Sequence, residues 1–488
     1  MASVFTGAFF AFGQNEIDVY RLSNTYVQGS ARFDAMGGSF GALGAESGCI
    51  GINPAGFGRS SVSSFSFGFS GTSVKTTSGF NGNASSMNAF NMRVPNIAAT
   101  IVSDVSSSNS GLIYTQISFG LNRVANFNNS FNYTGTQTTS LLDVFANQAY
   151  GVLQSDIYST LPYTSALAYD TWAIDTALGY DDYYSASLVP GGRTIHNRTV
   201  LNKGGINEWY LALSANYLDK VYFGASLSYN TINFSESLIH KETAIDTTGN
   251  SETLRSFVYQ YDYKTKGGGL NLKIGAIFLP TDFLRFGLAI HTPTFYQLTD
   301  DYSADMQARH SYGINQIDPS LVPYDRYKYR IWTPTKFLGS MGLIFGDNGC
   351  LNVDVEYVNY GWGRLKSTTD QAYAPYDYAA ENTIVKEQLN SAVNVRIGGE
   401  WAINNTVFVR GGYGYYPKGD TLAKSYGKSF NQTISGGLGF RFNRVYLDLS
   451  VRYLMQSSVY KAFYESRTEL DVINTTFNIG FQYKFDYK

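Results

Sequence analysis

The 488-residue chain is poor in charge, in cysteine and in long apolar runs. Charged residues make up 15% of it, and a formal net charge of −2 gives no indication of nucleic-acid binding. Two cysteines, Cys49 and Cys350, suit neither a metal cluster nor a disulfide-rich scaffold. The mean hydropathy is −0.17, and no charge-poor run after the N-terminus is long enough for a helical span. Membrane-spanning helices are therefore excluded.

Aromatic residues and glycine are abundant instead, and the apolar residues alternate. Aromatics reach 16%, with 39 Tyr, 33 Phe and 49 Gly, a composition typical of strands and of aromatic girdles at membrane interfaces. Phe65, Phe67 and Phe69 share one face of an extended segment, and small polar residues share the other. The same alternation recurs to the end of the chain, with charges of both signs on the less apolar face. This pattern predicts strands that face lipid on one side and a polar interior on the other.

Fourteen such segments are predicted, and the connections between them alternate in length. Short connections follow the even-numbered segments and long ones follow the odd-numbered segments, as in an outer-membrane barrel. Closure into a barrel also removes sheet edges, which lipid cannot satisfy. We therefore predict an all-β fold, a 14-stranded antiparallel transmembrane β-barrel. Its strands are 62–72, 88–102, 110–124, 206–218, 221–234, 267–279, 283–292, 327–345, 350–360, 390–403, 406–416, 428–442, 445–456 and 471–485.

The first sixty residues differ from the rest. Residues 1–13 are apolar and end in Ala11-Phe12-Gly13, which indicates the remnant of a signal peptide whose basic start is missing. Residues 14–60 contain a Gly/Ala-rich stretch that would make a poor core alone, because glycine brings no side chain to bury. Apolar residues such as Phe40 and Phe57 argue against a linker. We predict a hatch over 14–60, packed in the lumen of a barrel over 61–488.

Three further features of the sequence are similar to those of a known protein family. Asn53-Pro54-Ala55 closes the Gly/Ala-rich stretch, Val94-Pro95-Asn96 lies in the second predicted strand, and an alternating aromatic row ends at Phe485. In these features the chain resembles the FadL/TodX (OMPP1) family of outer-membrane channels for hydrophobic compounds. The resemblance implies a hatch with an Asn-Pro-Ala motif inside a fourteen-stranded barrel, and an opening beside a kinked strand through which an apolar ligand leaves laterally. The loop predicted over 125–205 departs from it in length and in its Tyr, Asp and Ser content.

The two motifs also have physical interpretations. An asparagine amide both donates and accepts, so Asn53 suits a latch between hatch and wall, with Pro54, Ala55, Phe40 and Phe57 along the ligand path. Proline donates no ladder hydrogen bond, so Pro95 marks a bulge in the wall beside Val94, where Asn96 satisfies freed backbone groups. That bulge is either a lateral opening or a simple change of curvature.

The chain offers no set of residues for catalysis or for a metal. Of the histidines, His196, His240 and His310 are expected in outer loops and His291 at the outer end of a strand, with no metal-spaced pair among them. We therefore expect no enzyme, no cofactor and no metal. Cys49 and Cys350 are either linked by a disulfide or free, and free thiols are favoured. An ion-pair lattice is expected to brace the hatch from the lumen; its members are Asp354, Glu356, Arg396, Glu400, Arg410, Arg441 and Arg452.

Two functions remain open. The first is passive uptake of long-chain fatty acids or other hydrophobic compounds across the outer membrane of a Gram-negative cell, with both termini in the periplasm. The second is a non-transporting barrel that serves as a subunit of a secretion or barrel-assembly complex. Its partner surface would be the loop 125–205, through apolar residues such as Leu141, Leu142 and Trp172. Expected partners are outer-membrane lipids and lipopolysaccharide, a hydrophobic ligand, and possible neighbouring outer-membrane proteins, but no nucleic acid.

Overall fold

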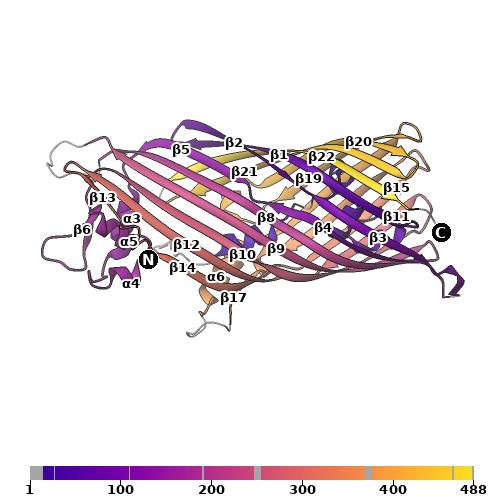
Figure 1. Cartoon of the computed structure of the whole chain (residues 1–488), viewed down its shortest axis with the longest axis horizontal. Coiled ribbons are helices and arrows are strands. Elements are labelled where there is room, and N and C mark those ends of the chain that lie inside the picture. The colour runs from indigo at the N-terminus through magenta and orange to yellow at the C-terminus, as the bar shows by residue number, and fades with distance from the viewer. Residues whose placement is uncertain are drawn as a thin grey trace.

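The chain folds into a closed barrel with helical segments inside it and at one end (Figure 1). The computed structural model describes residues 15–26, 28–108, 110–188, 192–246, 254–368, 376–463 and 466–485. In these ranges no helix has both the length and the apolar character needed to cross a membrane. The helical segments are α1 (Glu16–Ser23), α2 (Ala31–Ala35), η1 (Ser47–Gly51), η2 (Pro54–Arg59), η3 (Ser106–Ser108), α3 (Leu141–Ala149), α4 (Ile157–Thr160), α5 (Ser165–Asp170), η4 (Tyr360–Trp362), α6 (Ala379–Gln388) and α7 (Thr421–Ser425).

The fourteen predicted barrel strands are confirmed, and some of them are interrupted. In chain order they are β1 (Ser64–Phe80), β2 with β3 (Asn83–Arg93, Asn96–Asp104), β4 with β5 (Leu112–Asn126, Asn129–Gln137), β8 (Thr194–Tyr217), β9 (Val221–Ala244), β10 (Leu254–Phe278), β11 with β12 (Leu284–His291, Phe295–His310), β14 with β15 (Tyr324–Trp332, Lys336–Ile344), β16 with β17 (Gly349–Asn359, Arg364–Ser367), β18 (Ser391–Ala402), β19 (Val407–Pro417), β20 (Phe430–Phe442), β21 (Val445–Lys461) and β22 (Arg467–Lys484). Short strands β6 (Ile174–Thr176), β7 (Tyr184–Ala186) and β13 (Ile314–Gln316) lie outside this set.

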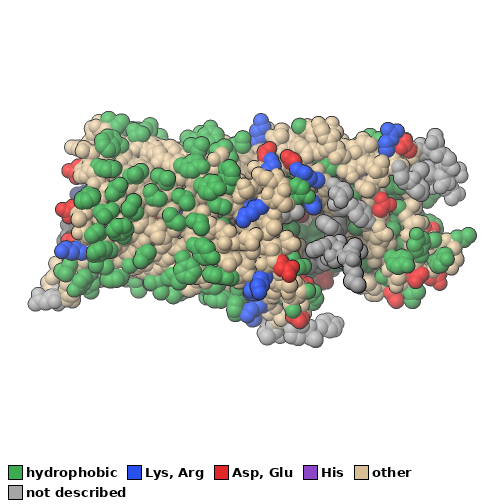
Figure 2. Space-filling model, turned by 180° about the vertical axis from the view of Figure 1, so that it is seen from behind, with side chains coloured by type: hydrophobic (Ala, Val, Ile, Leu, Met, Phe, Trp, Pro, Cys, Tyr) green, Lys and Arg blue, Asp and Glu red, His purple; other side chains and the backbone are tan. Residues whose placement is uncertain are grey.

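The barrel closes between its first and last strands, and its outer face is apolar over one half. β1 pairs antiparallel with β22 from Ser64↔Lys484 to Gly79↔Glu469. Phe65, Phe67 and Phe69 are exposed by 40–43%, whereas Ser66 between them is buried. Figure 2 shows hydrophobic side chains spread over the half of the outer surface nearer the short turns, with charged side chains mainly beyond it. The predicted alternation is therefore confirmed, with the apolar residues facing outward.

The strands continue well past this apolar belt, so the predicted connections are too long. The expected loop 73–87 is a hairpin whose turn is Asn81-Gly82, with φ of 48° and 79° as a type I′ turn requires. Likewise β5 and the first half of β8 occupy much of the expected loop 125–205, and they pair with each other. The ladder continues beyond the belt because backbone pairing needs no lipid on the outer face.

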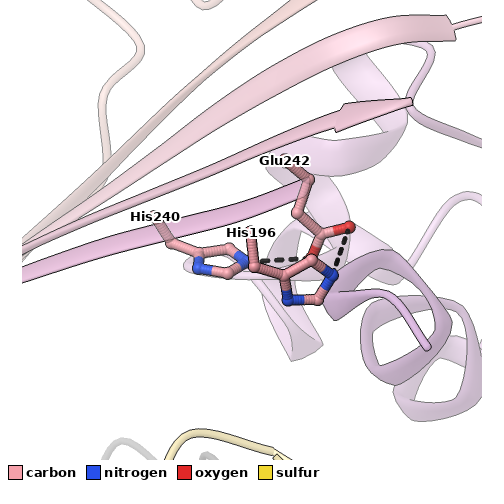
Figure 3. A group of neighbouring side chains, drawn as sticks. All are labelled: His196, His240 and Glu242. Atoms are coloured by element: carbon pink, nitrogen blue, oxygen red, sulfur yellow. Dashed lines mark hydrogen bonds and ion pairs between the residues drawn. The ribbon is translucent and has the colours of Figure 1, made fainter. Parts of the chain in front are cut away.

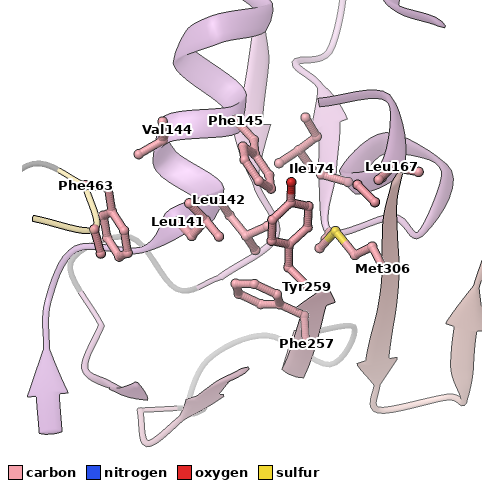
Figure 4. Packing of buried hydrophobic residues seen from close by; sticks show 14 of the residues in the cluster. Leu141, Leu142, Val144, Phe145, Leu167, Ile174, Phe257, Tyr259, Met306 and Phe463 are labelled. Atoms are coloured by element: carbon pink, nitrogen blue, oxygen red, sulfur yellow. The ribbon is translucent and has the colours of Figure 1, made fainter. Parts of the chain in front are cut away.

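Between β5 and β8, residues 138–188 form a cap that contains α3, α4, α5, β6 and β7. Its apolar side chains pack against one another and against wall residues such as Phe257, Tyr259 and Met306 (Figure 4). Leu141 and Leu142 are fully buried, so the expectation that they form a partner surface is wrong. Trp172 is 59% exposed and does lie on the surface of the cap.

Candidate functional site

The hatch backbone presses against the barrel wall at glycines on the wall strands. A Cβ atom on Gly224 would lie 2.4 Å from the backbone nitrogen of Ala55, and one on Gly412 would lie 2.2 Å from that of Gly37. Both distances are too short for any side chain. The Gly/Ala-rich hatch therefore packs against wall glycines that face it, and the two backbones are in direct contact.

Asn53 lies at one of these contacts and is fully buried. Its Nδ2 donates to the backbone oxygen of Gly41 at 2.7 Å and to that of Ala276 in β10 at 3.3 Å, while its Oδ1 accepts from the Ala55 N–H at 3.1 Å. The next residue is tied to the wall as well, since Ser214 Oγ donates to the Pro54 oxygen at 2.8 Å. The side chain thus joins the hatch to the wall, and its role as a latch stays a prediction.

Phe40 and Phe57, which were placed on the ligand path, lie in the packed core of the hatch. Phe40 is fully buried and stacks on Phe33 with ring centroids 5.5 Å apart, and Phe57 is 3% exposed. Cys49 belongs to the same core, and Cys350 of the wall packs against it. Both thiols are free.

An ion-pair lattice fixes the hatch from the lumen. Arg32 of α2 lies 2.9 Å from Glu400, which also contacts Arg410 at 2.5 Å, and Arg410 contacts Asp448 at 2.6 Å. A second group is centred on Asp354, whose carboxylate accepts the hatch N–H groups of residues 40 and 41. Further pairs are Arg396 with Asp354 and Glu356, and Arg452 with Asp34.

Among the described residues Arg441 makes no ion pair with this lattice, so its predicted place there is wrong. It lies near the end of β20, next to the short turn to β21, and its guanidinium lies over the rings of Phe408 and Tyr446 at 4.3 and 5.0 Å. Arg441 lies on the lumenal face of β20, as Phe408 and Tyr446 do on their strands, and it is exposed because β20 ends there at the mouth of the barrel.

A small polar cavity lies between the hatch and the wall. Its volume is about 60 Å³, and its lining includes Lys273, Lys336 and His291. Lys273 pairs with Glu208, and Lys336 Nζ donates to Thr25 Oγ1 at 2.9 Å. Ligand pockets usually measure ~300–1,000 Å³, so this cavity is too small for an acyl chain. Any apolar ligand that passes here must displace part of the hatch.

The wall has a seam where β2 gives way to β3. β2 pairs with β1 over Asn83–Arg93, whereas β3 pairs with both β1 and β4. Among the described residues no backbone ladder joins β2 to β5, its neighbour on the other side. Side chains bridge the two instead: Ser85 Oγ donates to Asn132 Oδ1 at 2.8 Å, and Asn83 Nδ2 donates to the Thr134 oxygen at 3.2 Å. Val94 and Pro95 lie at the point where the seam begins.

The hatch touches the wall at the base of the seam. Asn96 is fully buried; its Nδ2 donates to Asn122 Oδ1 at 2.6 Å, and its Oδ1 accepts from the hatch residue Ser47 at 2.9 Å. Gln28 of the hatch accepts from Arg93 at 3.0 Å and donates its N–H to the Arg123 oxygen at 3.2 Å. A displacement of the hatch therefore changes the contacts that hold the seam.

A second buried polar group ties the cap to the wall. His196 and Glu242 are cross-strand partners on β8 and β9, and His240 shares their face (Figure 3). The expectation that His196 and His240 lie in loops and apart from each other is wrong, because strands β8 and β9 extend beyond the belt. His240 Nε2 and Glu242 Oε1 are 2.8 Å apart, and Glu242 accepts from Ser140 Oγ at 2.6 Å and from the Leu141 N–H at 2.8 Å.

His196, His240 and Glu242 form a donor set that zinc uses elsewhere, with ligand atoms within 4.8 Å of one another. However, Arg198 Nε donates to His240 Nδ1 at 3.2 Å, so the neutral ring carries its proton on Nε2 and donates it to Glu242. A metal on Nε2 would require that proton to leave and Arg198 to move. The group is therefore built as a hydrogen-bonded link from wall to cap.

On β8, His196 is thirteen residues from Trp209, which lies in the apolar belt, and this separation corresponds to roughly 40 Å along the strand. The link between wall and cap is therefore outside the membrane-spanning part of β8. Burial lowers the pKa of His196 to about 4, and burial together with the Arg198 charge lowers the pKa of His240 well below its usual value. Burial also raises the pKa of Glu242. Both imidazoles are therefore neutral at neutral pH.

The two ends of the described chain lie in different parts of the barrel. Helix α1 lies in the lumen on the side of the long connections, where Tyr20 packs edge-on against Tyr360 at 4.9 Å and Arg21 lies 4.2 Å over the Phe234 ring. Phe485 lies at the short-turn end, where its N–H donates to the Ser63 oxygen at 2.9 Å. The expected signal remnant, residues 1–13, lies outside the described residues.

No family model matches the sequence, and no curated protein matches it. Solved structures do match. The P. putida toluene transporter TodX aligns with a TM-score of 0.53 at 12% identity over 94% of this chain and 99% of its own. A Pseudomonas aeruginosa FadL homologue aligns at 0.55 and 11% identity, over 95% and 100%. The Ralstonia pickettii toluene transporter TbuX aligns at 0.51 and 13% identity, over 94% and 98%. The chain therefore has the fold of the FadL/TodX channels.

Proposed function

We propose that the chain is an outer-membrane channel for the passive uptake of hydrophobic compounds, with lateral release through the seam between β2 and β5. The long connections and the cap would face the outside, and the short turns would face the periplasm, as in other outer-membrane barrels. The proposal draws on the fold it shares with channels described as toluene transporters and as a FadL homologue.

The observation that carries the proposal is the missing ladder between β2 and β5. In a closed barrel each wall strand is normally joined to both neighbours by a backbone ladder, because closure leaves no sheet edge. The side-chain bridges of the seam lie beyond the apolar belt, since Asn132 pairs with Thr199 of β8, ten residues from Trp209. The seam meets lipid at its base, beside Pro95, where Asn96 pairs with Asn122. Between β2 and β5 a few side-chain hydrogen bonds replace the ladder, and each contributes only about 0.5–1.5 kcal/mol to stability. This part of the wall opens at lower cost than any fully paired part.

The residues beside the seam favour an acidic ligand, such as a long-chain fatty acid. Arg93 and Arg123 flank it, and the Nε atom of each is buried without a hydrogen-bond partner among the described residues. A carboxylate accepts from two arginines at once with favourable charge-assisted geometry. An apolar tail then points toward lipid while the acid group is held at the exit.

In the described part of the chain the cap, α1 and the hatch pack against the wall along the path of the ligand, so uptake would need two movements. The cap must first admit the ligand past its apolar core, and α1 and the hatch must then shift to let it reach the seam. Gln28 and Ser47 couple the second movement to the seam, because they bind Arg93 and Asn96.

A reversible cross-link across the seam tests the proposal. Ser85→Cys with Asn132→Cys replaces a side-chain contact of 2.8 Å and joins β2 to β5 under oxidising conditions. The matched control is Thr77→Cys with Ser86→Cys, a cross-strand pair already in the β1–β2 ladder. Uptake of a labelled fatty acid by cells that rely on this channel should stop in the oxidised seam variant and return with reductant. Unchanged uptake in the oxidised seam variant would contradict lateral release.

A second candidate function is that of a fixed subunit in an outer-membrane complex. The observation that favours it is the outer surface of the cap, where Tyr150, Trp172 and Leu178 are 69%, 59% and 102% exposed. Residues 138–192 contain six Asp and no basic residue, so the surface would suit a basic partner. Isolation in mild detergent separates the two functions, since a stoichiometric protein partner favours the subunit and a lone barrel with bound lipid favours transport.

A further inference from the structure

We infer that the outer face of the barrel at β8, β9, β10, β12, β14 and β17 binds the phosphate groups of a phosphorylated glycolipid in the outer leaflet. Strands β8, β9, β10, β12 and β14 lie side by side on one face of the barrel (Figure 1). The inference rests on the orientation given in the proposed function, in which the long connections lie outside.

The position of the membrane boundary on this face follows from a row of large apolar residues. Cross-strand pairing joins Trp209, Tyr229, Leu270, Phe295 and Trp332 into one continuous row. Each of them points outward, with exposures from 36% to 49%. A row rich in aromatic residues marks the interface between hydrocarbon and headgroups in barrels of this kind.

Basic residues begin just beyond this row, on the side of the long connections. Seven of them point outward, as the alternating exposure of their strands requires, namely Lys203, Lys264, Lys266, Arg326, Lys328, Arg330 and Lys366. We call these residues the basic patch. Two acidic residues, Asp262 and Asp301, point outward among them, and Asp301 lies 2.6 Å from Arg326. Seven basic against two acidic residues leave an excess of five positive charges on the patch.

The basic residues form rows across neighbouring strands. Lys203 and Lys264 each pair with Ser235, and Lys264 also pairs with Asp301. Lys266 pairs with Thr299, which pairs with Lys328 on the next strand. Lys266 and Lys328 lie four residues beyond the apolar row, or roughly 13 Å along the strand, which is the depth of headgroup phosphates once strand tilt is included.

A hollow lies on the same surface. Its volume is about 350 Å³, and most of its lining residues point outward, among them Lys203, Lys264 and Tyr324. β8 bends beside it at Gly204, whose φ of 116° is open to glycine and strained for other residues. The hollow offers lysine ammonium groups and serine and tyrosine hydroxyls as donors to a phosphorylated sugar. Its three carboxylates, Glu236, Asp262 and Asp301, are acceptors for the hydroxyl groups of the sugar.

The opposite side of the barrel shows that this charge is local. On β20 to β22 and the loop before them, basic residues are matched by acidic neighbours: Lys428 lies 3.3 Å from Asp471, and Arg467 pairs with Glu469. A surface that only kept the barrel soluble during assembly would have no reason to concentrate unbalanced positive charge above one part of the belt.

Lipid binding to the purified full-length barrel tests the inference. Native mass spectrometry would compare lipid A that carries its phosphates with the same lipid after enzymatic dephosphorylation. The test variant is Lys203→Gln with Lys264→Gln and Lys266→Gln, and the matched control is Lys75→Gln with Lys461→Gln and Arg467→Gln on β1, β21 and β22. One basic side chain near an anionic surface contributes about a fivefold factor in affinity. We therefore expect about a hundredfold weaker binding of lipid A in the test variant and little change in the control.

Equal lipid A binding by the test variant and the unaltered protein would overturn the inference, as would equal binding of the dephosphorylated lipid. Competition by inorganic phosphate at millimolar concentration, or equal binding to phosphatidylglycerol vesicles, would overturn the assignment to a glycolipid. The measurement is independent of uptake. A barrel that binds lipid A through the patch but takes up no fatty acid refutes the transport function alone.

Discussion

Replacement of Asn53 by alanine is the sharpest test of how the hatch is held. The change removes the amide that bonds Gly41 within the hatch and Ala276 in the wall, and it leaves the Ala55 N–H without its acceptor. A buried group that loses its partner costs about 1–3 kcal/mol. Of the three bonds only the one to Ala276, at 3.3 Å, joins hatch to wall, whereas those to Gly41 and Ala55 lie within the hatch. About 1–3 kcal/mol therefore acts on the position of the hatch.

This free energy is small beside the stability of the closed barrel, whose strand ladders the substitution does not touch. It is large for a hatch that moves between two positions, because each 1.4 kcal/mol is a tenfold change in the equilibrium. We expect Asn53→Ala to keep heat-modifiable migration on gels. Displacement of the hatch should become roughly 5-fold to 150-fold more frequent, visible as added leak in single-channel recordings.

Two further variants control this experiment. Asn53→Asp keeps an acceptor for the Ala55 N–H but loses both amide donors, so its leak should resemble that of Asn53→Ala. Asn15→Ala removes the N-cap of α1, whose Oδ1 accepts from the Ile17 N–H at 3.0 Å, at a cost of ~0.5–2 kcal/mol without any contact to the wall. Leak and uptake equal to those of the unaltered protein, or an equal leak from Asn15→Ala, would refute the latch.

Three other predictions concern the cap and the orientation. Glu242→Gln should speed hydrogen exchange of the first α3 amides at least tenfold, because a neutral amide replaces the carboxylate that accepts from Ser140 and Leu141; unchanged exchange would show that the cap is held by its apolar core alone. The His196 ring should stay neutral in NMR titrations down to about pH 5, since burial lowers its pKa to about 4, and a midpoint near 6.5 would contradict the sealed link. Protease added to intact cells should cut within the cap and spare the Asp219-Lys220 turn, and the reverse pattern would invert the orientation.

Much of the fold was readable from the sequence because it depends on local alternation. A strand between lipid and a polar lumen must present apolar side chains on every second residue, and Phe65, Phe67 and Phe69 do so. The ends of the strands were less readable, because beyond the belt the outer face meets water and the alternation fades. The Asn81-Gly82 pair did carry a local hairpin signal, and it gives the true turn between β1 and β2.

The motifs Asn53-Pro54-Ala55 and Val94-Pro95-Asn96 marked two places where local chemistry is unusual, and the structure puts both at contacts between hatch and wall. What the sequence left open was the partner of each residue. The bond from Asn53 to Ala276 spans 223 residues. Nothing in the local pattern around either residue specifies the other.

Only the tertiary structure brought together Arg198, His240 and Glu242 with the first turn of α3. Arg198 and His240 are 42 residues apart, and they meet because the register of β8 on β9 places them opposite each other. A shift of that register by one residue would turn every side chain of one strand to the other face of the barrel. The alternation within each strand is fixed by the sequence, whereas the register between strands depends on the packing of the whole wall, the hatch and the cap.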